Sequence, residues 1–185
     1  ELAAGYTTLA NQGVRIDPYL IERVSTRDGH VLEEHLLRPA EVIEPQISFL
    51  LTRMLEGVID RGTGVSARYI DAELAGKTGT TDFFTDAWFA GFTPKYSLLV
   101  WVGYDQNRFL GRGMTGATAA LPIWRLMIEA GLEEGWIDPD DEFRPPPGLT
   151  TRRVEYRTGL LPGKGAKRVV RETFIAGTDP VQIYD

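Results

Sequence analysis

Ala75-Gly76-Lys77-Thr78-Gly79-Thr80-Thr81 stands directly before two further strand-like runs of this chain. Successive side chains of a β-strand point to opposite faces, so Thr78 and Thr80 are expected to present their hydroxyls on one face. Lys77, a candidate catalytic residue, adds a compact positive charge that attracts carboxylates and holds a neighbouring hydroxyl in place. We call residues 77–80 the Lys-Thr-Gly-Thr box, and we predict that it binds the carboxylate of a substrate.

The box also has features that acyl transfer requires. Gly79 has no side chain, so a bound peptide can lie close along the strand. The backbone N–H of Thr80 is the candidate donor to an oxyanion, a role that typically contributes about 10²- to 10³-fold in rate. We expect Thr81 to support the box, and Phe83 and Phe84, which follow in a loop, to wall the substrate groove.

Helical and strand-like patterns surround the box. We expect helices over 2–12, 45–60 and 119–130, and a hairpin with strands at 19–24 and 30–33. The helix over 45–60 has one apolar face at helical spacing, formed by Ile47, Leu50, Leu51, Met54, Leu55 and Val58.

Three successive strands, at 74–81, 86–92 and 96–104, are joined by short turns and predict an antiparallel meander. The third strand is apolar on both faces, so we place it at the centre of the sheet, with helices covering both sides. Asp86 begins the second strand; its two candidate roles are to cap the start of the strand and to orient a site residue, and we favour the structural role. The predicted fold class is therefore α+β, with an antiparallel sheet covered by helices.

A proline-rich stretch, Pro145-Pro146-Pro147-Gly148, predicts a boundary between two parts of the chain. Residues 1–145 would form the main body, and residues 146–185 a small tail of short strands and turns. An acidic stretch over 129–142 and a basic stretch over 152–171 are interpreted as solvated faces that are able to pair with each other.

Composition excludes several classes of function. The 185 residues are 43% hydrophobic and 25% charged, as in a globular domain, and the net charge of -6 argues against a nucleic-acid partner. There is no cysteine and no apolar run of membrane-spanning length, so we expect no thiolate metal site and no membrane contact from this segment.

Other motif interpretations fail on spacing. A phosphate-binding loop would need glycine at position 71, which is Asp71. His30 and His35 are read as exposed loop histidines, and the acidic run at 138–142 lacks the glycine of a calcium loop. We predict no metal site and no cofactor.

With its surroundings, the box resembles a known family. The runs Asp86–Pro94 and Val100–Asp105 follow it, the Arg61–Gly64 turn precedes it, and an Asn-x-Gly turn ends the first helix. Over about residues 1–130 the chain closely resembles the transpeptidase domain of class A penicillin-binding proteins, the bifunctional glycosyltransferase/transpeptidases of peptidoglycan synthesis. Lys77, Thr78, Gly79 and Thr80 match the third motif of that family, and Thr81 matches its usual continuation.

This resemblance implies a β-lactamase/transpeptidase-like fold that is incomplete without its N-terminal half. It implies a serine D,D-transpeptidase that cross-links stem peptides and is acylated by β-lactams, located on the periplasmic face of the bacterial inner membrane. The family's other two motifs are Ser-x-x-Lys, which carries the nucleophile, and Ser-x-Asn. None of the four serines begins either motif: Ser25, Ser48, Ser66 and Ser97.

We therefore expect the nucleophile in a separate N-terminal segment, which would be the partner of this chain, and we expect the isolated chain to be inactive. Two alternatives remain at this point. One is a D,D-carboxypeptidase or β-lactamase of the same superfamily, and the other is a non-catalytic module that binds cell-wall peptides.

Overall fold

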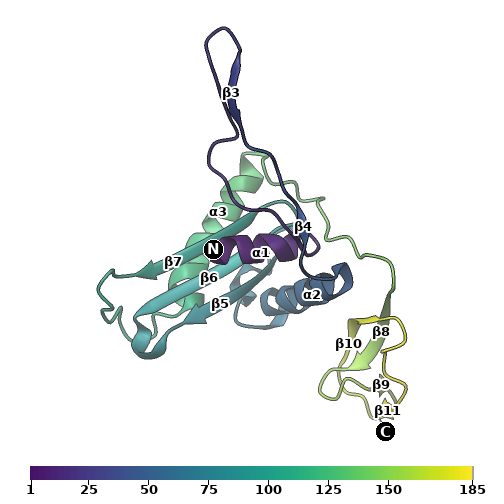
Figure 1. The fold of residues 1–185 in the computed structure, drawn as a ribbon. Coiled ribbons are helices and arrows are strands. Elements are labelled where there is room, and N and C mark those ends of the chain that lie inside the picture. Colours follow the sequence, from purple (N-terminus) through teal and green to yellow (C-terminus); the bar gives the residue numbers. More distant parts are fainter. Residues whose placement is uncertain (185) are drawn as a thin grey trace.

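The structure is a computed structural model and describes residues 1–184 (Figure 1). Its helices are α1 (Leu2–Ala10), α2 (Pro45–Arg61) and α3 (Leu121–Glu133), with short turns η1 (Val65–Ala67), η2 (Asp82–Phe84) and η3 (Gly116–Ala120). Its strands are β1 (Val14–Arg15), β2 (Arg23–Ser25), β3 (Val31–Glu34), β4 (Ala40–Glu41), β5 (Ala75–Thr80), β6 (Asp86–Phe92), β7 (Ser97–Gly103), β8 (Leu149–Glu155), β9 (Leu161–Pro162), β10 (Val169–Ile175) and β11 (Ile183–Tyr184).

The main sheet has three antiparallel strands in the order β5-β6-β7. Its register places Thr78 of the box opposite Phe89, and Gly79 opposite Trp88. The meander predicted from the sequence is therefore confirmed, and the box lies on an edge strand.

Helices cover both faces of this sheet. Phe89 packs on Trp124 of α3, with ring centroids 5.0 Å apart, and both side chains are fully buried. On the other face Tyr6 of α1 contacts Phe92, with centroids 6.3 Å apart. Figure 1 shows α3 behind the sheet and α1 in front of it, which gives three layers, and the buried hydrophobic cluster that contains Phe89 and Trp124 lies on the α3 side.

The predicted position of the third strand is wrong for the described residues. The central strand is β6, and β7 pairs only with β6, so its outer edge is free. The strand is apolar on both faces because helices pack on both faces, and that pattern does not reveal how many strands flank it. Trp101 of β7 is 42% exposed.

The helix α2 has about the predicted extent, but the apolar face found in the sequence is not the face that it buries. The residues that it buries are Ser48, Phe49, Thr52, Glu56 and Ile59. Ile47, Leu51 and Met54, from the apolar face, are exposed. Polar side chains can be buried here because their hydrogen bonds are satisfied: Ser48 donates to the carbonyl of Leu9 in α1 at 3.0 Å, and Thr52 donates to that of Ser48 within α2 at 3.1 Å.

The predicted hairpin forms an arm that projects from the body (Figure 1). Strands β2 and β3 pair antiparallel, and every residue in them is exposed. His35 lies at the base of the arm and stacks on Tyr19, with ring centroids 4.3 Å apart. Below the arm, β1 pairs with β4.

The last strands form a separate small group. β8 pairs antiparallel with β10, and β9 pairs parallel with β11. We call residues 149–184 the C-terminal strand group. It contacts α2 through Arg61, which pairs with Glu172 of β10 at 2.8 Å, and the stretch before it is held by Gln46, which donates to the carbonyl of Pro147 at 3.1 Å.

Candidate active site

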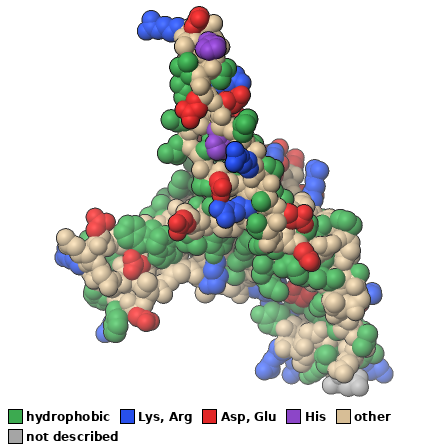
Figure 2. Space-filling view, in the orientation of Figure 1, with side chains coloured by type: hydrophobic (Ala, Val, Ile, Leu, Met, Phe, Trp, Pro, Cys, Tyr) green, Lys and Arg blue, Asp and Glu red, His purple; other side chains and the backbone are tan. Residues whose placement is uncertain are grey.

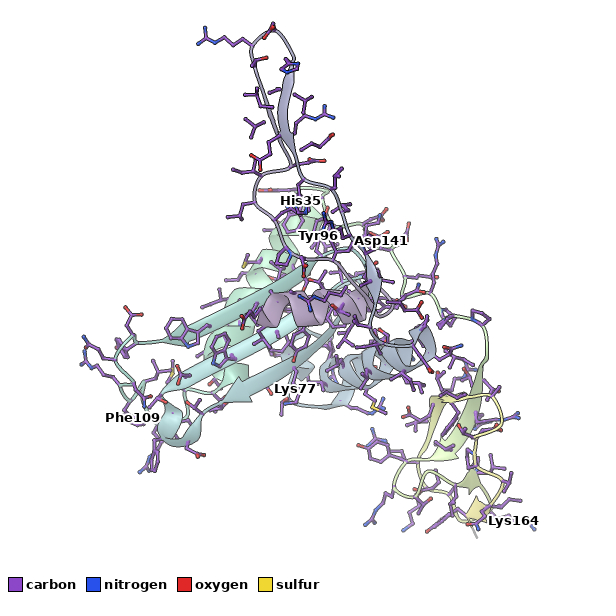
Figure 3. The ribbon with its side chains drawn as sticks, viewed as in Figure 1. His35, Lys77, Tyr96, Phe109, Asp141 and Lys164 are labelled. Carbon is purple, nitrogen blue, oxygen red and sulfur yellow. The ribbon has the colours of Figure 1, made fainter. Side chains whose placement is uncertain are left out.

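Lys77 lies on the box strand β5, which pairs only with β6, so the outer edge of β5 is free in the described residues. Its side chain is exposed, and its Nζ donates to the carbonyl of Thr78 at 2.8 Å (Figure 3). No carboxylate pairs with it among residues 1–184, whose ion pairs all involve other cations. The ammonium group is therefore held at the strand edge and remains able to bind an anion.

The two threonine hydroxyls of the box have different partners. Thr78 Oγ1 lies 2.8 Å from Thr63 Oγ1, in the turn that follows α2. Thr80 Oγ1 accepts a hydrogen bond from the backbone N–H of Gly116 at 3.0 Å. Because the Thr80 oxygen already accepts this bond, its own hydrogen is directed elsewhere and can be donated to a ligand.

Gly79 is required for packing as well as for ligand approach. A Cβ added at Gly79 would lie 3.1 Å from Cβ of Trp88, opposite it on β6. Gly116 packs even more closely, because a Cβ there would lie 2.3 Å from the carbonyl oxygen of Trp88 and 2.6 Å from that of Gly79. The segment at Gly116 therefore lies directly against the box, and only a residue without a side chain fits there.

Phe83 and Phe84 form the tight turn after the box, and both have left-handed backbones, with φ of 61° and 52°. Phe83 is 84% exposed, whereas Phe84 packs edge-on against Phe109, with centroids 6.5 Å apart. An open hollow of about 540 Å³ lies at this end of the box. It is lined by Thr80, Thr81, Asp82, Phe83, Thr85, Asp86 and Asn107.

Asp86 fixes the end of the box strand. Its Oδ1 accepts from Nε1 of Trp101 at 2.9 Å, and its Oδ2 accepts from the hydroxyls of Thr85 at 3.0 Å and Thr81 at 3.1 Å. These bonds, that from Trp101 above all, lower the pKa of the Asp86 carboxyl. Asp86 therefore has the structural role expected from the sequence, and it also holds Thr81.

Sequence reasoning missed two residues that contact the box. The Arg61–Gly64 turn was recognised, but nothing in it marked Thr63 as a neighbour of Thr78, because the two are 15 residues apart. Gly116 was not singled out, and it is 36 residues from Thr80. Only the folded chain brings these residues together.

One buried carboxylate lies outside the box, on the inner face of α2. Glu56 pairs with Nη1 of Arg53 at 2.7 Å, and it lines a cavity of about 160 Å³ together with Glu73, Asp60 and Arg68. Burial raises the pKa of the Glu56 carboxyl to about 7, against the opposing effect of Arg53.

None of the four serines hydrogen-bonds to the side chains of Lys77, Thr78 or Thr80 within the described residues. Ser48 is fully buried in α2, Ser25 lies on β2 in the exposed arm, Ser66 in η1, and Ser97 begins β7. None of them hydrogen-bonds to Lys77 among the described residues. The same residues hold no group of His, Asp and Glu side chains able to bind a metal ion, and no helix long and apolar enough to cross a membrane.

The class of protein follows from comparison of this fold and this strand with known families. The penicillin-binding protein transpeptidase domain matches residues 1–129, which is well over half of the chain. The chain therefore belongs to the penicillin-binding protein transpeptidase family.

Its relatives include penicillin-binding protein 1A of Aquifex aeolicus, which is 35% identical over 97% of this chain and 24% of that protein. The crystal structure of penicillin-binding protein 1A from Haemophilus influenzae superposes with a TM-score of 0.87 at 28% identity, covering 100% of this chain and 32% of the other. Penicillin-binding protein A of M. tuberculosis, solved as a ceftriaxone acyl-enzyme complex, aligns with a TM-score of 0.59 at 26% identity over 70% of this chain and 31% of that one. The chain spans about a quarter of the length of the curated relatives it matches.

Proposed function

We propose that this chain forms one wall of the active site of a peptidoglycan D,D-transpeptidase whose serine nucleophile lies in a segment N-terminal to it. The observation that carries the proposal concerns residues 1–184 of a chain of the transpeptidase family: within them, the outer edge of β5 is free and the ammonium group of Lys77 has no carboxylate partner. By family resemblance, the substrate is a stem peptide that ends in D-Ala-D-Ala.

In this proposal the substrate lies along the outer edge of β5 as an added strand. Lys77 attracts its terminal carboxylate, and the hydroxyls of Thr78 and Thr80 hydrogen-bond to the same group. Thr63 positions the Thr78 hydroxyl, and Gly116 positions that of Thr80. Phe83 and Thr81 line the hollow that follows the box, and we place one end of the substrate groove there.

The serine hydroxyl attacks the carbonyl carbon of the penultimate D-alanine and loses its proton to a base of the missing segment. The backbone N–H of Thr80 stabilises the oxyanion that forms. The peptide C–N bond then breaks, and the terminal D-alanine leaves with a proton. An amine of a neighbouring stem peptide attacks the resulting ester, which forms the cross-link and frees the serine. A β-lactam is attacked in the same way and remains bound as the acyl-enzyme.

The companion segment would complete the fold as well as the site. The free edge of β7 and the exposed apolar side chains Ile47, Leu51 and Met54 of α2 are surfaces that a larger domain would cover. We place the complete protein on the periplasmic face of the inner membrane, where peptidoglycan is assembled.

The test is intact-mass analysis and peptide mapping of a protein that carries this chain and the N-terminal segment, after incubation with penicillin. One penicilloyl adduct on a serine upstream of Glu1 is the expected result. An adduct on one of the four serines of this chain would show that the nucleophile is misassigned. A protein that is never acylated would be a non-catalytic module instead.

A further inference from the structure

The C-terminal strand group lies beyond residues 1–129, which the transpeptidase domain matches, and its net charge is opposite to that of the rest. Residues 149–184 contain seven basic and three acidic side chains, whereas residues 1–148 contain 13 basic and 22 acidic ones. Figure 2 shows Lys and Arg side chains projecting from this part of the surface. The sequence analysis interprets the acidic and basic stretches as solvated faces that are able to pair, and no ion pair among the described residues joins them.

The three carboxylates of the strand group are already engaged. Glu155 is buried and accepts from the backbone N–H groups of Arg157 and Thr158, both at 2.9 Å. Glu172 pairs with Arg61 of α2, and Asp179 pairs with Arg152 at 2.7 Å. None of the other six basic side chains forms an ion pair within residues 1–184: Arg153, Arg157, Lys164, Lys167, Arg168 and Arg171.

Two of these arginines oppose each other within the sheet. The register of β8 and β10 places Arg153 directly across from Arg171, and both are exposed. Like charges at directly opposite positions destabilise a strand pair. At the end of the same hairpin Arg168 stacks over the ring of Tyr156, 3.9 Å from its centroid. An anion bound between Arg153 and Arg171 would remove the repulsion between them.

We propose that the C-terminal strand group binds the carboxylates of a peptidoglycan strand, at a position separate from the groove along β5. This inference rests on the proposed function for the identity of the polymer. Five of the seven basic side chains are arginines, whose planar guanidinium groups bind carboxylates through two parallel hydrogen bonds. Stem peptides repeat along a glycan strand, so several carboxylates of one polymer can bind several of these cations at once.

A flexible strand fits this surface better than an anionic membrane does. A membrane is a broad plane, and its approach would bring the acidic body close to the same negative charge. A polymer strand can contact the strand group alone.

The position of the strand group relates it to the proposed site. Its contact residue Arg61 is the last residue of α2, and two residues later Thr63 hydrogen-bonds to Thr78 of the box. A polymer held on the strand group is therefore anchored next to the helix that leads to the box. The binding raises the local concentration of stem peptides at the proposed groove.

The experiment uses a protein that contains this chain and the serine-bearing segment, and it measures co-sedimentation with purified insoluble peptidoglycan at low and moderate salt. The test variant is Arg153→Gln/Arg171→Gln. The matched control is Arg27→Gln/Arg68→Gln, which removes the same charge from two exposed arginines outside the strand group. We expect the test variant to bind about five- to tenfold more weakly and the control to bind as the parent does.

Two further arms identify the ligand. In one arm, the carboxylates of the peptidoglycan are converted to amides. The parent is expected to bind this material as weakly as the test variant binds untreated peptidoglycan. Undiminished binding to this material would overturn the proposal, as would preferential binding of the parent to vesicles that contain phosphatidylglycerol. Equal binding of parent and test variant to untreated peptidoglycan would do the same.

Acylation by penicillin, measured on the same preparations, separates this proposal from the proposed function. We expect the test variant to be acylated at the parental rate, because neither arginine lies at the box. A protein that is not acylated at all would contradict the proposed function, whereas a loss of sedimentation with acylation intact supports the proposal made here.

Discussion

Lys77 is the residue on which the proposed chemistry depends most directly. Its Nζ contacts only the carbonyl of Thr78, so its removal breaks no ion pair within the described residues. In the complete protein, Lys77→Ala is expected to lower the rate of penicillin acylation about 10- to 100-fold, because a charge-assisted bond to the ligand carboxylate is lost. Stopped-flow or gel-based acylation kinetics measure this rate.

The control for that measurement is Lys95→Ala. Lys95 is exposed and pairs with Asp141 at 2.7 Å, in a surface ion pair of small energetic value. Its replacement removes the same charge without touching the box. If Lys77→Ala were acylated at the parental rate, the role assigned to Lys77 would be wrong.

The raised pKa of Glu56 predicts that the free energy of unfolding depends on pH. The pKa of its carboxyl is raised to about 7 in the folded protein, from an ordinary value of 4.5, chiefly by burial. The folded state therefore holds the proton more tightly than the unfolded state. Its stabilising contribution is complete below about pH 4.5 and is lost as the pH rises through about 7.

Glu56→Gln keeps the shape of the side chain and removes the titration. Between pH 5 and pH 8, we expect the parent to lose about 2 kcal/mol more of its free energy of unfolding than the variant loses. Urea denaturation at the two pH values gives this difference. It is carried out on the parent and on Glu56→Gln, each joined to the serine-bearing segment. Identical pH profiles would mean that Glu56 remains ionised throughout, held by Arg53 and undisturbed by the neighbouring Glu73 and Asp60.

At the scale of elements, the site depends on how the segment before α3 lies against β5. Gly116 donates its N–H to Thr80 and leaves no room for a side chain beside the carbonyl oxygens of Trp88 and Gly79. In Gly116→Ala, the added methyl group is therefore expected to displace the segment at residue 116 from β5. We expect the acylation rate to fall at least tenfold and the free energy of unfolding to fall by about 1–3 kcal/mol. Thermal melting and acylation kinetics report the two effects.

Gly5→Ala is the matched substitution for this test. Gly5 lies within α1, and a Cβ there would meet no atom within 4 Å. The same added methyl group is expected to leave acylation unchanged and to stabilise the helix slightly, by about 0.5–1 kcal/mol. An unimpaired Gly116→Ala protein would show that the contact with the box is not needed.

Elements were predicted well where the sequence pattern is local. The three helices, the meander and the arm all follow from spacing and turn residues near in sequence. The buried face of α2 could not be predicted from the spacing of apolar residues. Ser48, Thr52 and Glu56 lie on that face with their polar groups satisfied by hydrogen bonds or an ion pair, which such spacing does not report.

At the scale of the whole molecule, the exposed surfaces predict how the isolated chain behaves. The free edge of β7 and the exposed apolar side chains of α2 are typical of surfaces that another segment covers. We expect residues 1–185 alone to associate, to bind a hydrophobic dye and to melt without a sharp transition. Joined to the serine-bearing segment, the same residues should form a monomer that melts cooperatively.

Analytical ultracentrifugation and calorimetry distinguish these states. Residues 1–185 that are monomeric and melt in one cooperative transition would contradict the proposal that a companion segment completes the fold. The comparison of the two proteins at equal concentration controls for association that depends on concentration alone.

The sequence alone determined the class of this chain and the location of its box, because Lys77-Thr78-Gly79-Thr80 and its neighbouring strands are contiguous and their meaning is local. Tertiary structure alone decided which residues surround the box. Thr63 and Gly116 come to it from 15 and 36 residues away, and Ser48 on the inner face of α2 donates to the carbonyl of Leu9 in α1, 39 residues away. Such contacts arise from chain folding in three dimensions, where the neighbours of a residue depend on packing and not on position along the chain.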